Sequence, residues 1–103
     1  MELSPMLAER IAALGARYGA RRVVLFGSRA RGDNRERSDI DLAVFGLPER
    51  SAAPFRLALE DLPTLLKCDV VLMRDGLDRA LAANIERDGV TIYEQGTELS
   101  SGL

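Results

Sequence analysis

The sequence of 103 residues contains no histidine and no tryptophan, and its one cysteine is Cys68. Without histidine, the Ser-His-Asp and Cys-His arrangements of nucleophilic catalysis are excluded, as is a histidine general base. One cysteine cannot form an internal disulfide, and Cys68 alone cannot make a typical zinc site. Any catalysis must therefore depend on carboxylates, arginines, hydroxyl groups and metal ions, and we interpret Cys68 as a core residue.

Long hydrophobic runs are also missing. No apolar stretch approaches the roughly 18 residues that span a membrane, and the acidic Glu2 stands where a signal peptide would be basic. We therefore expect a cytoplasmic protein that does not bind membranes. The formal net charge of −2 gives no overall attraction to nucleic acid, which is usually bound by a basic surface, so no direct nucleic-acid contact is expected.

Length and composition predict one globular domain. A chain of 103 residues, of which 47% are hydrophobic, can form one core but not two. Charged residues make up 29%, which is typical of a folded rather than a disordered chain. We assign residues 1–95 to this domain and expect residues 96–103 to form a flexible C-terminal tail.

The spacing of apolar residues predicts an α/β (α+β) fold. Short β-branched runs predict strands at residues 22–26, 40–45, 68–73 and 90–94. Helical spacing predicts helices at residues 5–18, from about 53 to 67 with Pro63 as a point where the helix can split, and around Leu77, Leu81 and Ile85. The first two strands are too close in sequence for a crossover helix, so we expect a mixed sheet of about four strands flanked by helices.

The dipeptide Gly27-Ser28 follows the first predicted strand, where a helical turn can begin. Free backbone N–H groups and a hydroxyl at such a point can hold phosphate oxygens, although Gly-Ser is also common in ordinary turns. Arg29 and Arg31 come next and could neutralise a triphosphate through bidentate contacts. The arginines further along this polar segment are more typical of a solvated loop.

Two aspartates open the second predicted strand. Asp39 and Asp41 are two positions apart, so an extended backbone directs both side chains to the same face. The residues that alternate with them form an apolar row, which indicates that the strand buries its other face. A plainer interpretation is that Asp39 belongs to a turn and Asp41 is a solvated surface residue.

A third carboxylate, Asp69, lies at the start of the third predicted strand. If the second and third strands are neighbours in register, three carboxylates meet, and each pair repels by roughly 1 kcal/mol or more. Oxygen-only ligands suit Mg²⁺, for which Mn²⁺ can substitute, and two ions about 3.5–4 Å apart would stabilise an in-line phosphoryl displacement. Taken alone, Asp69 could also be an ordinary residue of a strand start.

Together these residues resemble the signature of the minimal nucleotidyltransferase (MNT) family in the DNA polymerase β-type superfamily. That signature is Gly-Ser, ten residues, then Asp-x-Asp, and here it reads Gly27-Ser28, residues 29–38, then Asp39-Ile40-Asp41. The third family carboxylate matches Asp69. The resemblance extends over nearly the whole chain, although the helical second domain of larger family members is lacking.

The resemblance implies a polymerase-β-type fold and an Mg²⁺-dependent transfer of AMP from ATP. It also implies catalytic and metal-binding roles for Asp39, Asp41 and Asp69. Gly27, Ser28, Arg29 and Arg31 would bind the nucleotide. Such proteins are typically encoded beside a small all-helical HEPN ribonuclease toxin and act as its antitoxin, so the implied acceptor is a tyrosine hydroxyl on that toxin.

Two alternatives stay open. The chain could serve as a subunit that modifies a small molecule such as an antibiotic. It could also be a non-catalytic antitoxin that masks its partner, although a pure binding module has no reason to keep three carboxylates that repel one another. A nucleic-acid polymerase is disfavoured because an acidic-leaning chain of this size offers no extended basic groove for a primer.

Overall fold

A mixed sheet forms the centre of the molecule. The computed structural model describes residues 2–33, 35, 37–74 and 79–96. The four strands are β1 (Arg22–Phe26), β2 (Ile40–Phe45), β3 (Cys68–Met73) and β4 (Val90–Glu94), in the order β3-β2-β1-β4. β1 is antiparallel to β2 and β4, whereas β2 and β3 are parallel. The predicted strands and the mixed sheet are confirmed.

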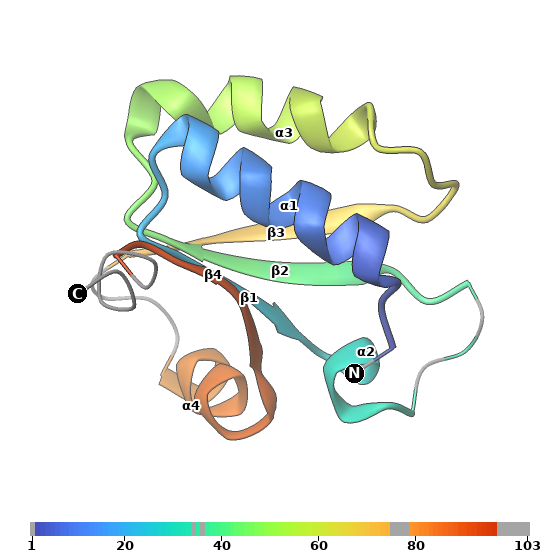
Figure 1. Cartoon of the computed structure of the whole chain (residues 1–103). Helices are drawn as coiled ribbons and strands as arrows, with labels where there is room; N and C mark the ends of the chain where they lie inside the picture. The colour runs from blue at the N-terminus through green and yellow to red at the C-terminus, as the bar shows by residue number, and fades with distance from the viewer. Residues whose placement is uncertain (1, 34, 36, 75–78, 97–103) are drawn as a thin grey trace.

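Helices lie on both faces of this sheet (Figure 1). The helical elements are α1 (Pro5–Tyr18), α2 (Ser28–Arg31), the 3-10 turn η1 (Glu49–Ser51), α3 (Ala52–Glu60) and α4 (Arg79–Asp88). α1 and α3 cover one face, α4 lies against the other, and α2 sits beyond the end of β1. None of the helices in the described ranges is long and apolar enough to cross a membrane.

The boundaries of α1 follow from its terminal residues. The Ser4 hydroxyl accepts a hydrogen bond from the Leu7 N–H at 3.2 Å, and Pro5 occupies the first turn, where its missing N–H costs nothing. Gly19 ends the helix with a φ of 84°, a left-handed conformation that glycine adopts without strain. The predicted start and end of this helix are confirmed.

The predicted helix from about 53 to 67 is wrong in its C-terminal half, because α3 ends at Glu60. Pro63 explains the difference: it has no N–H to donate, its ring would clash with the carbonyl of Leu59, and it disfavours the helical conformation of Leu62. The Leu62 N–H instead bonds the Leu59 carbonyl at 3.2 Å in a tighter turn. Residues 61–67 therefore return the chain to β3 without regular structure.

Alternation along the strands builds a separate apolar cluster on each face of the sheet. The larger cluster lies under α1 and α3 and includes Val23, Leu25, Ile40, Leu42 and Val44 from the sheet and Leu7, Ile11, Phe55 and Leu59 from the helices. The smaller one joins Val24 and Ala43 to Ile85 of α4. The predicted apolar row of β2 is confirmed, and this leaves Asp41 on the face of the smaller cluster. Leu77 and residues 97–103 of the predicted tail lie outside the described residues.

Phe55 should contribute much of the stability. Its side chain is fully buried, and its ring lies 6.2 Å from that of Tyr18 in an edge-on arrangement. We expect Phe55→Ala to lower the free energy of unfolding by about 3–5 kcal/mol, a large part of the total for a domain of this size. Urea denaturation measures this, with Leu57→Ala, whose side chain is 63% exposed, as the matched control. Equal losses in the two variants would contradict the assigned core.

Candidate active site

Asp41 and Asp69 are direct neighbours in the parallel pairing of β2 with β3. Paired strands lie about 4.8 Å apart, so two carboxylates on the same face share one small region of the surface. Asp39 comes just before β2 and is exposed to solvent. The condition set by the sequence, that the two strands are neighbours in register, is therefore met.

Gly27 brings the start of α2 against this acidic group. Its φ of 76° and ψ of −157° fall in a region that is essentially restricted to glycine. A Cβ added to it would lie 2.5 Å from the Asp41 Oδ2 atom. A side chain at this position would thus meet the carboxylate directly, and only glycine allows the Ser28 end of α2 to approach Asp41 this closely.

Burial and neighbouring negative charge raise the pKa of two groups in the site, the Asp41 carboxyl and the Cys68 thiol. Partial burial raises the pKa of Asp41 above its ordinary value, and the charges of Asp69 and then Asp39 raise it further. The pKa of the Cys68 thiol is raised by burial and by the same two aspartates, so Cys68 is held as the unreactive thiol. Lys67 partly offsets the charge, because its Nζ atom lies 3.4 Å from Oδ1 of Asp69.

The donor set fits a hard divalent cation, since all three candidate ligands are carboxylates. Among the residues that the structure describes, no three acidic, cysteine or histidine side chains already converge into a metal-binding cluster. The Asp69 carboxylate pairs with Lys67, whose Nζ atom lies 3.4 Å from its Oδ1. The pKa of Asp41 is raised first by burial and then by the charges of Asp69 and Asp39, and a bound cation would offset these effects.

Arg29 occupies a different place from that expected of a phosphate ligand. Its side chain is buried, with 7% of the residue exposed. Its Nε donates to the Ser38 carbonyl at 2.9 Å, and its Nη1 donates to the Glu2 carbonyl at 2.8 Å. The guanidinium is therefore used to hold the protein's own main chain.

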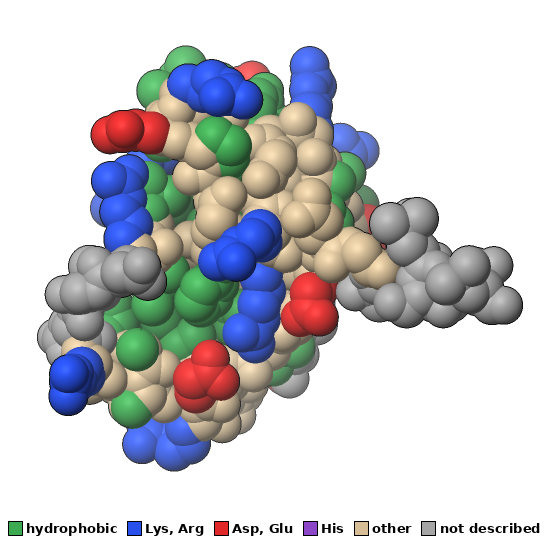
Figure 2. All heavy atoms as spheres, turned by 90° about the vertical axis from the view of Figure 1, so that its left-hand side faces the viewer, with side chains coloured by type: hydrophobic (Ala, Val, Ile, Leu, Met, Phe, Trp, Pro, Cys, Tyr) green, Lys and Arg blue, Asp and Glu red, His purple; other side chains and the backbone are tan. Residues whose placement is uncertain are grey.

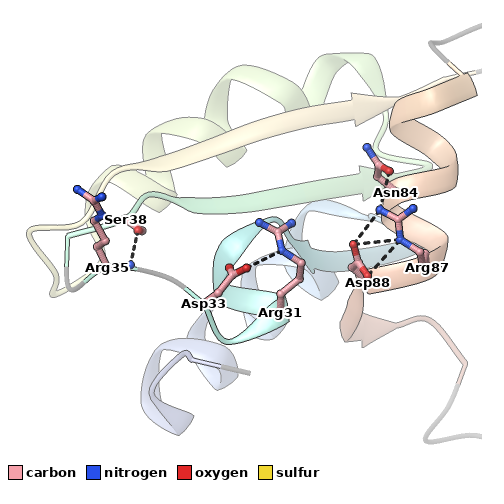
Figure 3. A network of polar contacts seen from close by, with 7 residues as sticks. All are labelled: Arg31, Asp33, Arg35, Ser38, Asn84, Arg87 and Asp88. Atoms are coloured by element: carbon pink, nitrogen blue, oxygen red, sulfur yellow. Dashed lines mark hydrogen bonds and ion pairs between the residues drawn. The ribbon is translucent and has the colours of Figure 1, made fainter.

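Ser28 and Arg31 remain at the entrance to the site. Ser28 is the first residue of α2 and is partly exposed. Arg31 points outward and pairs with Asp33 at 3.2 Å, with both side chains largely exposed (Figure 3). An exposed pair of this kind is worth little, so Arg31 can exchange Asp33 for an anionic ligand at small cost.

Sequence reasoning did not single out Lys67 or Ser38, which contact Asp69 and Arg29 in the structure. Lys67 precedes Asp69 by two residues, and this spacing in an extended segment was the available signal for the ion pair. The Ser38 hydroxyl accepts a hydrogen bond from the Arg35 N–H at 2.9 Å, which closes the loop before Asp39 (Figure 3). On α4, Arg87 bonds Asn84 and Asp88, a cluster to which nothing assigns a role.

An apolar strip continues from the acidic residues along the same sheet face. Phe45 and Met73 are partly exposed and pack against the smaller cluster, and Arg22 lies over the Phe45 ring at 5.3 Å. Figure 2 views the molecule from the end at which β2 and β3 finish and shows a patch of hydrophobic side chains bordered by Lys or Arg. We call the partly exposed Phe45, Val71 and Met73 the apolar floor; Ala43 is on the same face but fully buried against Ile85 of α4.

Comparison with known proteins supports a specific family. The model of the polymerase beta nucleotidyltransferase family matches residues 9–98. The solved structure of a minimal nucleotidyltransferase is 41% identical, with a TM-score of 0.66 and coverage of 81% of this chain and 86% of the other. No curated protein sequence gives a significant match.

Two further solved structures share the fold. A toxin-antitoxin structure with AMP-PNP is 22% identical, with a TM-score of 0.64 and coverage of 88% of this chain and 76% of that one. A complex of a tri-AMPylated Shewanella oneidensis HEPN toxin with an MNT antitoxin is 19% identical, with a TM-score of 0.58 and coverage of 92% and 76%. The predicted polymerase-β-type fold is confirmed.

Gly27→Ala should damage the site and the fold together. The backbone conformation alone costs a non-glycine residue about 1–3 kcal/mol, and the added methyl group displaces the Asp41 carboxylate. Gly32→Ala is the matched control, because Gly32 has a φ of 84° but nothing within 4 Å of an added Cβ. Chemical denaturation and Mn²⁺ titration should show strain in both variants and weakened Mn²⁺ binding in Gly27→Ala only. Equal Mn²⁺ binding in the two would contradict the assigned contact.

Asp41→Asn should stabilise the metal-free protein. A carboxyl whose pKa is raised by folding carries a penalty that is fully present above the folded-state pKa and disappears as the pH falls through it towards the unfolded value of about 3.9. Because solvent screens this partly exposed group, we expect a gain on the order of 0.5 kcal/mol, or roughly 2–4 °C in Tm, at pH 7.

The gain should vanish near pH 3.5, and added Mg²⁺ should raise the Tm of the wild type but not of Asp41→Asn. Differential scanning calorimetry at several pH values measures both effects. A variant that is less stable than the wild type at pH 7 without Mg²⁺ would contradict an ionisation penalty at Asp41 from burial and neighbouring charge.

Proposed function

The chain belongs to the polymerase beta nucleotidyltransferase family, and from that premise we propose that it is an Mg²⁺-dependent adenylyltransferase acting as an antitoxin. It transfers AMP from ATP to a tyrosine hydroxyl of a partner HEPN toxin. The observation that carries the proposal is the register pair Asp41 and Asp69 beside Gly27-Ser28. The solved relatives with AMP-PNP and with a tri-AMPylated HEPN toxin support the choice of nucleotide and partner.

The three aspartates would hold the metal. Asp39 and Asp41 would bind the Mg²⁺ that accompanies ATP, and Asp69 would complete the binding of a second ion; Mn²⁺ has the same ligand preference and can substitute. Bound there, the ions would supply charge neutralisation for the triphosphate and for the departing pyrophosphate. Lys67 would then be released from Asp69, since the cation replaces its charge.

The segment at the start of α2 would bind the phosphates. The Gly27-Ser28 backbone and the Ser28 hydroxyl would hold terminal phosphate oxygens, which approach a backbone that carries no side chain at Gly27. Arg31 would leave Asp33 and offset phosphate charge. Arg29 would contribute to the site indirectly. Its guanidinium donates to the carbonyls of Glu2 and Ser38 and so fixes the main chain at these two positions.

The proposed transfer forms one phosphorus–oxygen bond and breaks another. The acceptor hydroxyl oxygen attacks the α-phosphorus of ATP and forms a new phosphorus–oxygen bond. The bond between the α-phosphorus and the bridging oxygen breaks, and pyrophosphate leaves with its electron pair. As the alternative to holding a second ion, Asp69 would accept the hydroxyl proton as a general base.

The exposed part of the apolar floor would give the partner a surface on the same sheet face as the aspartates, four residues further along β2 and β3. Phe45 and Met73 lie on the catalytic face and are only partly buried within the described chain. A helical toxin packed there would bury this surface. We also propose that the protein is cytoplasmic and binds neither nucleic acid nor membranes directly.

Replacing Asp41 with Asn should abolish transfer while preserving the fold, because it removes ligand charge at nearly constant volume. We expect at least about a 100-fold loss of rate. The chain is co-expressed with the protein encoded beside it, supplied with Mg²⁺ and ATP, and the intact masses of both chains are recorded. The wild type should add whole adenylyl units to the partner, and Asp41→Asn should add none.

Asp61→Asn is the matched control, because Asp61 is exposed and follows α3 on the opposite side of the sheet. It should transfer as the wild type does. Undiminished transfer by a folded Asp41→Asn protein would overturn the proposed chemistry. Tight binding without any mass gain on either chain would replace it with masking of the partner or with transfer to a small molecule, two outcomes that pyrophosphate release separates.

A further inference from the structure

Arg29 is the only charged residue classed as buried within the described part of the chain. It lies in α2, directly after Ser28, and two of its side-chain hydrogen bonds reach different segments. Nε donates to the Ser38 carbonyl at 2.9 Å, and Nη1 donates to the Glu2 carbonyl at 2.8 Å. Its own backbone carbonyl accepts a bond from the Glu2 N–H at 2.8 Å. One residue thus joins the N-terminal segment, α2 and the entry to β2.

The bond to Ser38 has a direct consequence for Asp39. Asp39 is exposed and precedes the first residue of β2, so no strand pairing of its own fixes it. The residue before it is held by Arg29 through the Ser38 carbonyl, and the residue after it is held by the Ile40 N–H, which bonds the Lys67 carbonyl at 2.8 Å. Asp39 therefore lies between two anchored backbone groups.

The N-terminal segment takes part in the same arrangement. Glu2 exchanges two hydrogen bonds with Arg29, one in each direction. Leu3 is 9% exposed and packs into the larger apolar cluster, which fixes the position of Glu2 from the other side. Residues that are distant from Asp39 in the sequence thus determine how firmly Arg29 is held.

We infer that Arg29 is a positioning residue, which sets the Ser38–Asp39 backbone at a fixed place relative to Ser28 and is itself held by Glu2. This inference rests on the proposed function, because it concerns the metal-binding carboxylate Asp39. An arginine is required since its rigid planar fork donates in two fixed directions to two carbonyls at once. A lysine, with one nitrogen on a flexible stem, cannot keep both segments in register.

Arg29→Lys should therefore weaken metal binding more than another substitution that lowers the stability of the protein by the same amount. Residues that orient metal ligands typically change metal affinity or activity by about 10- to 100-fold when replaced, and we expect a loss in this range for Mn²⁺ measured by electron paramagnetic resonance with AMP-PNP present. Hydrogen exchange of the Ser38 and Ile40 amides should become at least about 10-fold faster, while α1 amides such as Leu14 stay as in the wild type.

The matched control is a substitution of Ile11, to Val or Ala, chosen to lower the Tm as much as Arg29→Lys does. Ile11 is a fully buried residue of α1, on the other face of the sheet from Asp41. Its variant should bind Mn²⁺ as the wild type does. Glu2→Pro, which removes the Glu2 N–H bond and sets the proline ring against the Arg29 carbonyl, should shift Mn²⁺ affinity in the same direction by a smaller factor and serves if Arg29→Lys does not fold.

The outcomes separate the inference from the proposed function. Equal Mn²⁺ affinity in Arg29→Lys and the Ile11 control, or unchanged exchange at Ser38 and Ile40, would overturn the positioning role. If the wild type binds Mn²⁺ but transfers no AMP, the proposed function fails, whereas a selective loss of Mn²⁺ affinity in Arg29→Lys still supports the positioning role. If the wild type binds no Mn²⁺, the exchange rates alone decide.

Discussion

Repulsion between Asp41 and Asp69, paired across β2 and β3, is the constraint around which the site is arranged. The strands that carry them are held by burial on their other face, where Ile40, Leu42 and Val44 pack under α1 and α3. That packing allows one face of the sheet to keep like charges side by side. Lys67 relieves part of the repulsion, and Gly27 leaves the space in which the carboxylate and the start of α2 approach each other.

The sequence predicted the four strands with their observed ends, because β-branched runs bounded by glycine or polar segments are strong local signals. It also predicted which face of β2 is buried. The strand order could not be read locally; the pairing of Asp41 with Asp69 entered only as a condition, which the structure meets. The end of α3 was misjudged because helical spacing continues past Glu60, whereas Pro63 prevents the helix from continuing with it.

Arg29 and Arg31 show where sequence reasoning about a site reaches its limit. Both arginines follow Gly27-Ser28 in the same helical turn, and both suit phosphate equally well by type and spacing. Their places differ because α2 directs Arg29 inward, to the carbonyls of Glu2 and Ser38, and Arg31 outward, to the exposed Asp33. The direction of a side chain in so short a helix depends on tertiary contacts with segments far away in the sequence, which no local pattern contains.

The central claim is that the acidic face is a metal site completed by nucleotide. Crystals grown with Mn²⁺ and AMP-PNP test it most directly, because anomalous scattering locates Mn²⁺ without reference to any assumed ligand. The account predicts Mn²⁺ bound by Asp39 and Asp41, with Asp69 turned from Lys67 to the metal and terminal phosphate oxygens at Ser28. Mn²⁺ bound elsewhere, or nucleotide bound away from Gly27-Ser28 with Asp69 still paired to Lys67, would contradict it.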